Sequence, residues 1–160
     1  AAVCLYPPFA LAKTFDWALL REEPLVLLAP RGLAHLEPHE LLRSQPLIRY
    51  DRQLGGGQMV ERYLRAAQIA PRERFELSSL VAIAMMVEKG LGVALVPDTA
   101  LAWPDGQGVV RLALPMQQAE VRRFGVIWLR ASARLPLIHH LVACARTVVA
   151  ERGGPQAPPR

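Results

Sequence analysis

The segment that most constrains the fold is Phe75–Pro97, which reads FELSSLVAIAMMVEKGLGVALVP. The pattern predicts a short strand at Phe75–Leu77, an apolar helix from Leu80 to about Lys89, and an apolar strand that Pro97 stops. Strand, helix and strand in so few residues form a compact βαβ-type unit, in which the helix begins beside the carboxyl end of a strand. That position suits a small anionic ligand, and we interpret the segment as part of a sensor rather than of an enzyme.

Length and composition allow one domain with a real core, or two small lobes. The 160 residues are 52% hydrophobic and 21% charged, values that are ordinary for a globular protein and argue against disorder. The net charge is +5, but the arginines are spread along the chain and no basic run is longer than Arg122–Arg123. We interpret the charge as a solvated basic surface, with a nucleic-acid patch as the alternative.

The two cysteines, Cys4 and Cys144, lie in apolar stretches far apart in the sequence. We expect both to be small buried side chains in a reducing compartment, with a disulfide as the alternative. No stretch approaches the ~20 apolar residues of a membrane span, and the opening residues lack the features of a secretory signal. These features predict a soluble, cytoplasmic protein with no membrane partner.

The remaining patterns alternate between strands and helices. We expect strands at 1–6, 25–29, 46–50, 109–114 and 124–129, and helical segments at 38–44, 58–68 and 135–151. The LVLLA run at Leu25–Ala29 lies between two prolines and is typical of a strand buried on both faces. The opening strand, Ala1–Tyr6, is equally apolar, so we expect it to be buried and the chain to be a fragment. The class is therefore α/β with a largely parallel or mixed sheet.

Less regular stretches carry their own expectations. The glycine run Gly55–Gly57 has the composition of a flexible loop, although it would also let the backbone approach a ligand. We expect single turns at 99–103 and at 104–108. The last helix should place one apolar stripe in the core, formed by Leu137, Leu141, Cys144 and Val148.

Three stretches occur in a recognisable order: EEPLVLLAPRGLAH, HELLRSQPLIRYD and FELSSLVAIAMMVEKGLGVALVP. With the closing strand RRFGVIWLR and the helix after it, they resemble the effector-binding domain of LysR-type transcriptional regulators over the chain up to Glu151. The resemblance implies the α/β fold of type 2 periplasmic binding proteins, in which two lobes are joined by crossing segments and the effector binds between them. It implies that residues 1–29 plus 125–151 are the remainder of lobe I, 30–124 are lobe II, and 152–160 are a disordered tail.

The resemblance also implies what lies outside this sequence. The family begins with a winged helix-turn-helix, a linker helix and the first part of lobe I, and none of these occurs here. DNA would be bound only through that missing N-terminal head. The chain itself would be the effector-sensing and dimerisation domain of a cytoplasmic bacterial regulator, with a dimer or tetramer as the assembled form. Effector binding would change lobe closure, and lobe closure would change the spacing of the heads.

The predicted effector site centres on the start of the Leu80 helix. Ser78 and Ser79 offer hydroxyls beside free backbone N–H groups, which suit a small carboxylate; the alternative is that Ser78 only caps the helix. Tyr50, Asp51 and Arg52 follow the strand at 46–50, at the rim expected for a ligand cleft. Arg52 would bind a carboxylate through two hydrogen bonds, or would instead be solvated or paired with Asp51.

Other predicted contacts are more peripheral. Tyr6 ends the opening strand and Pro97 closes the strand after the helix, and both are expected near the effector pocket. The exposed side of the helix at 58–68 carries Arg62, Arg65 and Gln68, which the resemblance suggests as part of a dimer interface; plain solvent exposure is the alternative.

Enzyme signatures are missing from the sequence. His35 and His39 have Pro38 between them and no evident third ligand, so we expect no metal site there. The sequence has no nucleophile elbow, phosphate-binding loop or dinucleotide fingerprint, and we expect no cofactor. The alternatives to a ligand-sensing domain are a solute-binding receptor of the same fold and a dimerisation module that senses nothing.

Overall fold

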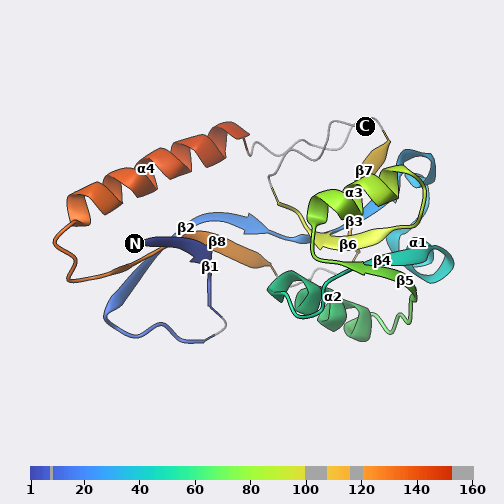
Figure 1. Cartoon of the computed structure of the whole chain (residues 1–160), viewed down its shortest axis with the longest axis horizontal. Helices are drawn as coiled ribbons and strands as arrows, with labels where there is room; N and C mark the ends of the chain where they lie inside the picture. Colours follow the sequence, from blue (N-terminus) through green and yellow to red (C-terminus); the bar gives the residue numbers. More distant parts are fainter. Residues whose placement is uncertain (8, 100–107, 116–120, 153–160) are drawn as a thin grey trace. The chain divides into compact units, whose positions relative to one another are not determined.

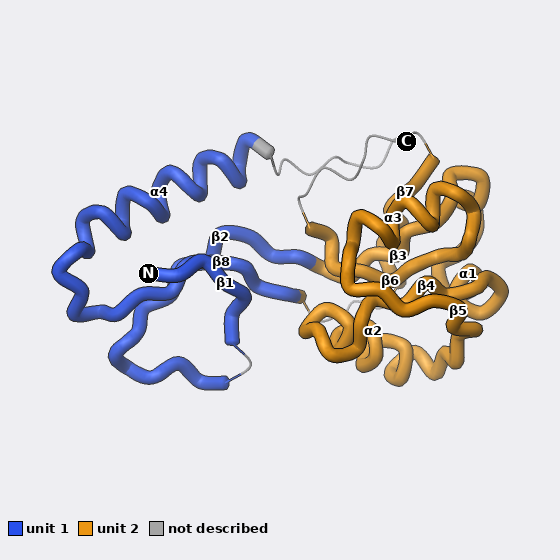
Figure 2. The backbone as a smooth tube through the Cα atoms, viewed as in Figure 1, with its two compact units in different colours: residues 1–23, 122–160 blue, residues 24–121 orange. Residues whose placement is uncertain are grey.

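The structure, a computed structural model, describes residues 1–7, 9–99, 108–115 and 121–152. The chain forms two compact units (Figure 2). Unit 1 combines Ala1–Glu23 with Arg122–Arg160, and unit 2 is Pro24–Val121. The lobes expected from the sequence change at 29/30 and 124/125, so they assign residues 24–29 to lobe I whereas the contacts place them in unit 2. The lobe assignment itself stays a prediction, and the predicted turns and tail at 99–108 and 152–160 lie almost wholly outside the described residues.

Unit 2 is a mixed sheet with helices on both faces (Figure 1). The three strands β6 (Ala94–Pro97), β3 (Leu25–Pro30) and β7 (Val109–Ala113) pair antiparallel in that order. The strands β4 (Pro46–Tyr50) and β5 (Arg72–Leu77) pair parallel, and a bridge between Leu47 and Val93 attaches β4 to the segment that leads into β6. The predicted βαβ-type unit is confirmed, with β4 lying between its two strands.

Alternation along β3 explains how unit 2 buries both faces of its sheet. Leu25, Leu27 and Ala29 belong to one core cluster, with α1 (Pro38–Ser44) and α2 (Gly55–Ala66). Val26 and Leu28 belong to the other cluster, with α3 (Leu80–Glu88). Because successive side chains of a strand point to opposite faces, a continuous apolar run is what a doubly covered strand requires. The prediction of a strand buried on both faces is confirmed.

The glycine run departs from its expected role as a flexible loop. Gly55, Gly56 and Gly57 form the first turn of α2. A Cβ atom built on Gly57 would overlap the carbonyl group of Asp51, with 2.6 Å to its carbon, and one on Gly56 would lie 2.5 Å from Cε1 of Tyr50. The glycines therefore let the helix start pack directly against the end of β4, which is a packing requirement that composition alone does not reveal.

Helices α2 and α3 end in the same way. The residue after each cap has a positive φ, +53° at Gln68 and +71° at Gly90. The N–H group of Ile69 donates to the carbonyl of Leu64 at 3.0 Å, and that of Leu91 donates to the carbonyl of Met86 at 3.1 Å. These are the hydrogen bonds of a Schellman motif that span six residues. Gly90, the first glycine predicted after α3, therefore adopts the left-handed conformation that ends the helix. Gln68 adopts the same conformation after α2, although its Cβ makes that conformation less favourable than it is for glycine.

Unit 1 is a three-stranded antiparallel sheet with the order β1–β8–β2, crossed by a long helix (Figure 1). Its elements are β1 (Ala2–Leu5), β2 (Phe15–Glu23), β8 (Arg122–Leu129) and α4 (Leu135–Arg152). The 15–23 strand was not among the predictions, because its mixture of acidic, basic and apolar residues hides the alternation. The core of this unit contains Ala18, Val126, Trp128, Ile138 and Val142.

Two burial predictions in unit 1 are wrong. The opening strand was expected in the core, but β1 is an edge strand whose Val3 is 53% exposed. The stripe expected to be buried on α4 is also exposed, including Cys144, and the helix instead packs through Ile138 and Val142. This helix is apolar on more than one side, so the spacing of its apolar residues cannot predict which side packs against the sheet. Cys4 is half-buried, and both cysteines are free.

Candidate functional site

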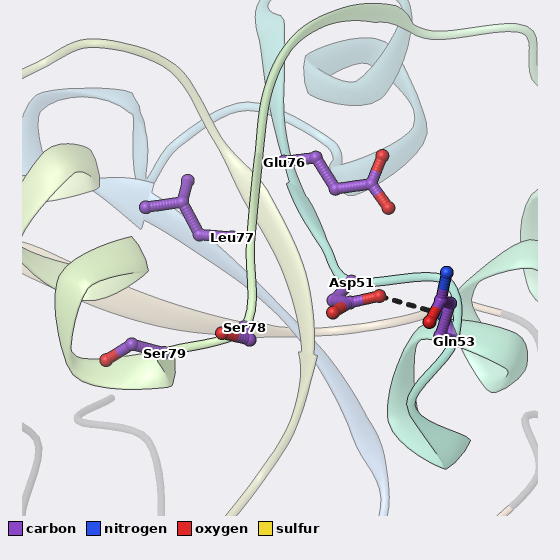
Figure 3. Close-up of a pocket in the computed structure, with 6 residues that line it drawn as sticks. All are labelled: Asp51, Gln53, Glu76, Leu77, Ser78 and Ser79. Atoms are coloured by element: carbon purple, nitrogen blue, oxygen red, sulfur yellow. Dashed lines mark hydrogen bonds between the residues drawn. The ribbon is translucent and has the colours of Figure 1, made fainter.

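A polar pocket of about 490 Å³ opens where β4 and β5 end and α3 begins (Figure 3). Its six lining residues come from unit 2 alone: Asp51, Gln53, Glu76, Leu77, Ser78 and Ser79. Three of them, Asp51, Ser78 and Ser79, are predicted effector contacts. Gln53, Glu76 and Leu77 were not predicted to line it, and only their position next to strand ends and the serine pair hinted at this role.

Strand pairing brings the two halves of the pocket together. Tyr50 lies opposite Leu77 in the parallel pair β4–β5, and the N–H of Asp51 donates to the carbonyl of Leu77 at 3.0 Å. The residues that follow the two strands therefore emerge at one edge of the sheet. This is the carboxyl edge, where ligands of α/β proteins bind.

The start of α3 supplies hydrogen-bond donors. Ser79 is the N-cap, and its hydroxyl oxygen accepts from the N–H of Ala82 at 3.3 Å. In the described part of the chain, the hydroxyl of Ser78 and the N–H groups of Leu80 and Val81 have no hydrogen-bond partner. The two serines therefore differ in role. Ser79 caps the helix, and the hydroxyl of Ser78 stays available to a ligand in the pocket.

We expect Ser79→Ala to lower the free energy of unfolding by about 1 kcal/mol, since the cap of α3 is lost. Ser78→Ala removes a hydroxyl that bonds to nothing in the described residues and should leave stability within about 0.5 kcal/mol of the wild type, as surface substitutions do. Urea denaturation of both variants measures the difference. Equal destabilisation by the two variants would contradict this division of roles.

The opposite wall of the pocket is acidic. The carboxylate of Asp51 accepts from the N–H of Gln53 at 2.9 Å, the contact drawn in Figure 3. Glu76 accepts from the backbone N–H of Arg52 at 3.1 Å. The pocket therefore offers N–H and O–H donors on the α3 side and carboxylate acceptors on the β4 side, so its two walls favour different groups of one ligand.

Arg52 does not line the pocket. Its guanidinium pairs with Glu73 and lies 3.6 Å from Glu76, rather than pairing with Asp51. A bidentate contact with an effector would require Arg52 to leave these partners. Its predicted role in binding is not tested by any contact, and its observed contacts link the segment after β4 to two glutamates of β5.

A buried arginine extends this charged network under the surface. Arg49 in β4 is 2% exposed and contacts Glu73 at 2.9 Å and Glu61 of α2. Hydrogen bonding from Arg49 holds the pKa of Glu61 below its ordinary value of 4.5. Ionised Glu61 therefore stabilises the folded state above its ordinary pKa, and this contribution is lost as the pH falls through the lowered value. The sequence showed Arg49 only as a polar residue within a strand.

The remaining predicted contacts lie elsewhere. Tyr50 is 7% exposed and packs in the core beside Gly56, which also approaches Pro97. Neither Tyr50 nor Pro97 lines the pocket. Tyr6 belongs to unit 1, where its ring meets Trp17 edge-on at 5.1 Å between centroids and lies 4.3 Å from the guanidinium carbon of Arg123. Effector contacts by these three residues stay predictions.

The predicted interface residues lie along the solvent side and the end of α2. Arg62, Arg65 and Gln68 are exposed, and Arg65 lies 3.5 Å from Glu61 one turn earlier. Their exposure is compatible with an interface or with plain solvation, so the interface stays a prediction.

Residues 1–150 match the family model described as the LysR substrate binding domain. The chain belongs to the LysR substrate-binding domain family. The LysR regulatory domain is a non-enzymatic module of a transcription factor, so the chain is not an enzyme. The predicted resemblance and its fold class, that of type 2 periplasmic binding proteins, are confirmed.

Solved structures support the fold. OxyR C206 mutant of Corynebacterium glutamicum matches with a TM-score of 0.69 and 19% identity over 94% of this chain, which spans only 48% of that protein. The CcmR regulatory domain of Synechocystis PCC6803, in complex with 2-PG, matches with a TM-score of 0.70 and 18% identity, over 91% of this chain and 71% of that one. The effector-binding domain of QuiR in complex with shikimate matches with a TM-score of 0.67 and 13% identity, over 91% and 71%. No curated protein matches the sequence.

Within the described ranges, no group of three or more histidine, cysteine, aspartate or glutamate side chains could hold a metal ion. No described helix is long and apolar enough to cross a membrane.

Proposed function

We propose that this chain is the effector-sensing and dimerisation domain of a bacterial LysR-type regulator, and that the polar pocket of unit 2 is part of its effector site. The domain would relay ligand binding to a DNA-binding head outside these 160 residues. As part of a transcription regulator, it would act in the cytoplasm. Support for the regulator comes from the family match over residues 1–150, and support for the site comes from the pocket itself.

The observation that carries the proposed site is the unpaired donor set at the start of α3. The Ser78 hydroxyl and the N–H groups of Leu80 and Val81 have no partner among the described residues, and the helix dipole adds positive potential at the same place. An anionic group of the effector would accept from these donors. A carboxylate is the proposed anion because its two oxygens can accept several hydrogen bonds in a small space.

The acidic wall narrows the ligand class further. Asp51 and Glu76 also line the pocket, and they would repel a ligand that carried only negative charge. A carboxylic acid with hydroxyl groups satisfies both walls, because its hydroxyls donate to Asp51 and Glu76 while its carboxylate faces α3. Two relatives of similar fold are complexes with 2-PG and shikimate, and shikimate is such a hydroxylated acid. We therefore propose a small hydroxylated carboxylic acid as the effector.

Isothermal titration calorimetry of the 160-residue chain with shikimate and a panel of related hydroxy acids tests this proposal. We expect saturable binding of at least one acid, no binding of its methyl ester, and affinity about tenfold weaker in Ser78→Ala. Ser44→Ala is the matched control, since Ser44 is also exposed but lies at the end of α1 and does not line the pocket. Absence of binding by the whole panel, or an affinity that Ser78→Ala leaves unchanged, would contradict the proposed site.

Dimerisation is proposed through the exposed face of α2 that carries Arg62 and Arg65, together with Gln68 just beyond the end of the helix. These side chains are exposed, and the helix is anchored from behind by Met59, Val60, Tyr63 and Leu64, so the face is held rigidly. Sedimentation of the wild type against Arg65→Glu would show whether a charge reversal on this face weakens self-association.

A further inference from the structure

A second cavity, of about 350 Å³, lies in unit 1 between α4 and the sheet. Its lining residues belong to unit 1, whereas the polar pocket described above belongs to unit 2. The walls that matter for its chemistry come from two strands and one helix: Trp17 and Ala18 of β2, Trp128 of β8, and His139, Val142 and Arg146 of α4.

Donors line this cavity, and carboxylates do not. His139 and Arg146 lie two turns apart on α4, which places them on the same side of the helix. In the part of the chain that the structure describes, neither side chain has an ion pair or hydrogen bond, and no aspartate or glutamate lines the cavity. An arginine without a carboxylate beside it is a ready partner for an anion.

The aromatic walls add a shape requirement. Trp128 supplies the indole of the wall, and the His139 ring meets it edge-on at 6.0 Å between centroids and 79° between planes. The register of β2 and β8 turns the Trp17 side chain to the opposite face of the sheet, where it meets Tyr6. Flat rings gain from packing against such indole surfaces, through both apolar contact and ring quadrupoles. A planar ligand fits these walls better than a branched or polyhydroxylated one.

One buried donor in the wall lacks an acceptor. Trp128 is 8% exposed, and its indole Nε1–H has no hydrogen-bond partner among the residues that the structure describes. Buried indole N–H groups nearly always have a partner, so an orphan at a cavity wall needs an explanation. An oxygen of a bound ligand would supply the missing acceptor.

We propose that this cavity is a second ligand site, which takes an aromatic carboxylate. The ring packs against the indole of Trp128 beside His139, and the carboxylate pairs with Arg146 and accepts from the Trp128 N–H. The site differs in chemistry from the polar pocket, because it has aromatic walls and no carboxylate of its own. This proposal does not depend on the effector site proposed above, and a separate experiment tests it.

The test is an amide and indole NMR titration of the ¹⁵N-labelled 160-residue chain with 1-naphthoate. The three tryptophans give three indole N–H signals, of which Trp128 is the reporter. We expect a saturable shift of the Trp128 indole signal with naphthoate, and none with the neutral naphthyl methanol or the cationic naphthyl methylamine. Arg146→Gln should weaken naphthoate binding by about tenfold or more, since it removes a charge-assisted pair.

Arg134→Gln is the matched control, because Arg134 is an exposed arginine just before α4 and does not line the cavity. Ser78→Ala should leave naphthoate affinity unchanged, which separates this site from the polar pocket. Arg146 is exposed, so its replacement should not impair folding. An unshifted Trp128 signal, equal binding of the neutral analogue, or equal affinity in Arg146→Gln would each overturn the proposal.

Discussion

Glu23→Gln is expected to lower the free energy of unfolding of unit 1 by about 3 kcal/mol, because it breaks a buried ion-pair cluster. Glu23 is fully buried at the end of β2. One carboxylate oxygen accepts from Nε of Arg21 at 2.6 Å, and the other accepts from Nε of Arg122 in β8 at 2.5 Å. Glutamine keeps the size of the side chain but leaves two neighbouring, largely buried guanidinium groups without their shared counter-charge.

The position of Glu23 makes this loss more than local. Glu23 is the last residue of unit 1 before the chain enters unit 2 at Pro24, and Arg122 is the first residue after it returns. The two residues also lie opposite each other in the β2–β8 register. The ion pair therefore fastens together the two chain segments that leave unit 1.

Urea denaturation followed by tryptophan fluorescence measures the effect, since two of the three tryptophans, Trp17 and Trp128, belong to unit 1. Glu22→Gln is the matched control, because Glu22 precedes Glu23 on the same strand but is exposed. We expect the control to change stability by less than about 0.5 kcal/mol. Equal midpoints for the two variants would show that the buried cluster does not stabilise this unit.

Gly57→Ala is expected to lower the free energy of unfolding by about 3 kcal/mol, because the added methyl group overlaps backbone rather than a flexible side chain. The new Cβ would overlap the Asp51 carbonyl oxygen and lie 2.9 Å from the Tyr50 carbonyl oxygen. Relief requires α2 to move away from the end of β4. Since Asp51 lines the polar pocket, the same substitution should also weaken effector binding.

Gly55→Ala provides the matched control for this prediction. Gly55 begins the same helix, and nothing lies within 4 Å of a Cβ built on it. Alanine there should stabilise the protein slightly, by up to about 1 kcal/mol, because it favours the helix over the unfolded chain. Thermal unfolding of the two variants should therefore shift in opposite directions, and a tolerated Gly57→Ala would contradict the observed packing.

Much of unit 2 could be predicted because its sequence patterns have one physical solution. The LVLLA run of β3 has no polar residue to face solvent, so it requires cover on both faces. The helix at Leu80 follows a serine pair and ends at a glycine, and these are strong boundary signals. Because β4 and β5 are parallel, the residues that follow them, Asp51 and the two serines, lie at the same edge of the sheet.

Predictions failed where the outcome depends on long-range packing. The apolar residues of α4 form more than one stripe, and only the sheet decides that Ile138 and Val142 are buried. The glycine run looks like a loop unless the proximity of Asp51 is known. In the site, composition could not show that Glu73 and Glu76 engage Arg52, because those residues are more than twenty positions away along the chain.

The most direct test of the central claim is to locate a bound hydroxy acid on the chain by ¹H–¹⁵N correlation spectra recorded during a shikimate titration. The proposal predicts saturable shifts of the Ser78, Ser79, Leu80 and Val81 amides, with smaller changes at Asp51 and Gln53, because the carboxylate would accept from the start of α3. Saturable shifts confined to other residues, with these amides unmoved, would contradict the assignment of this pocket as the effector site.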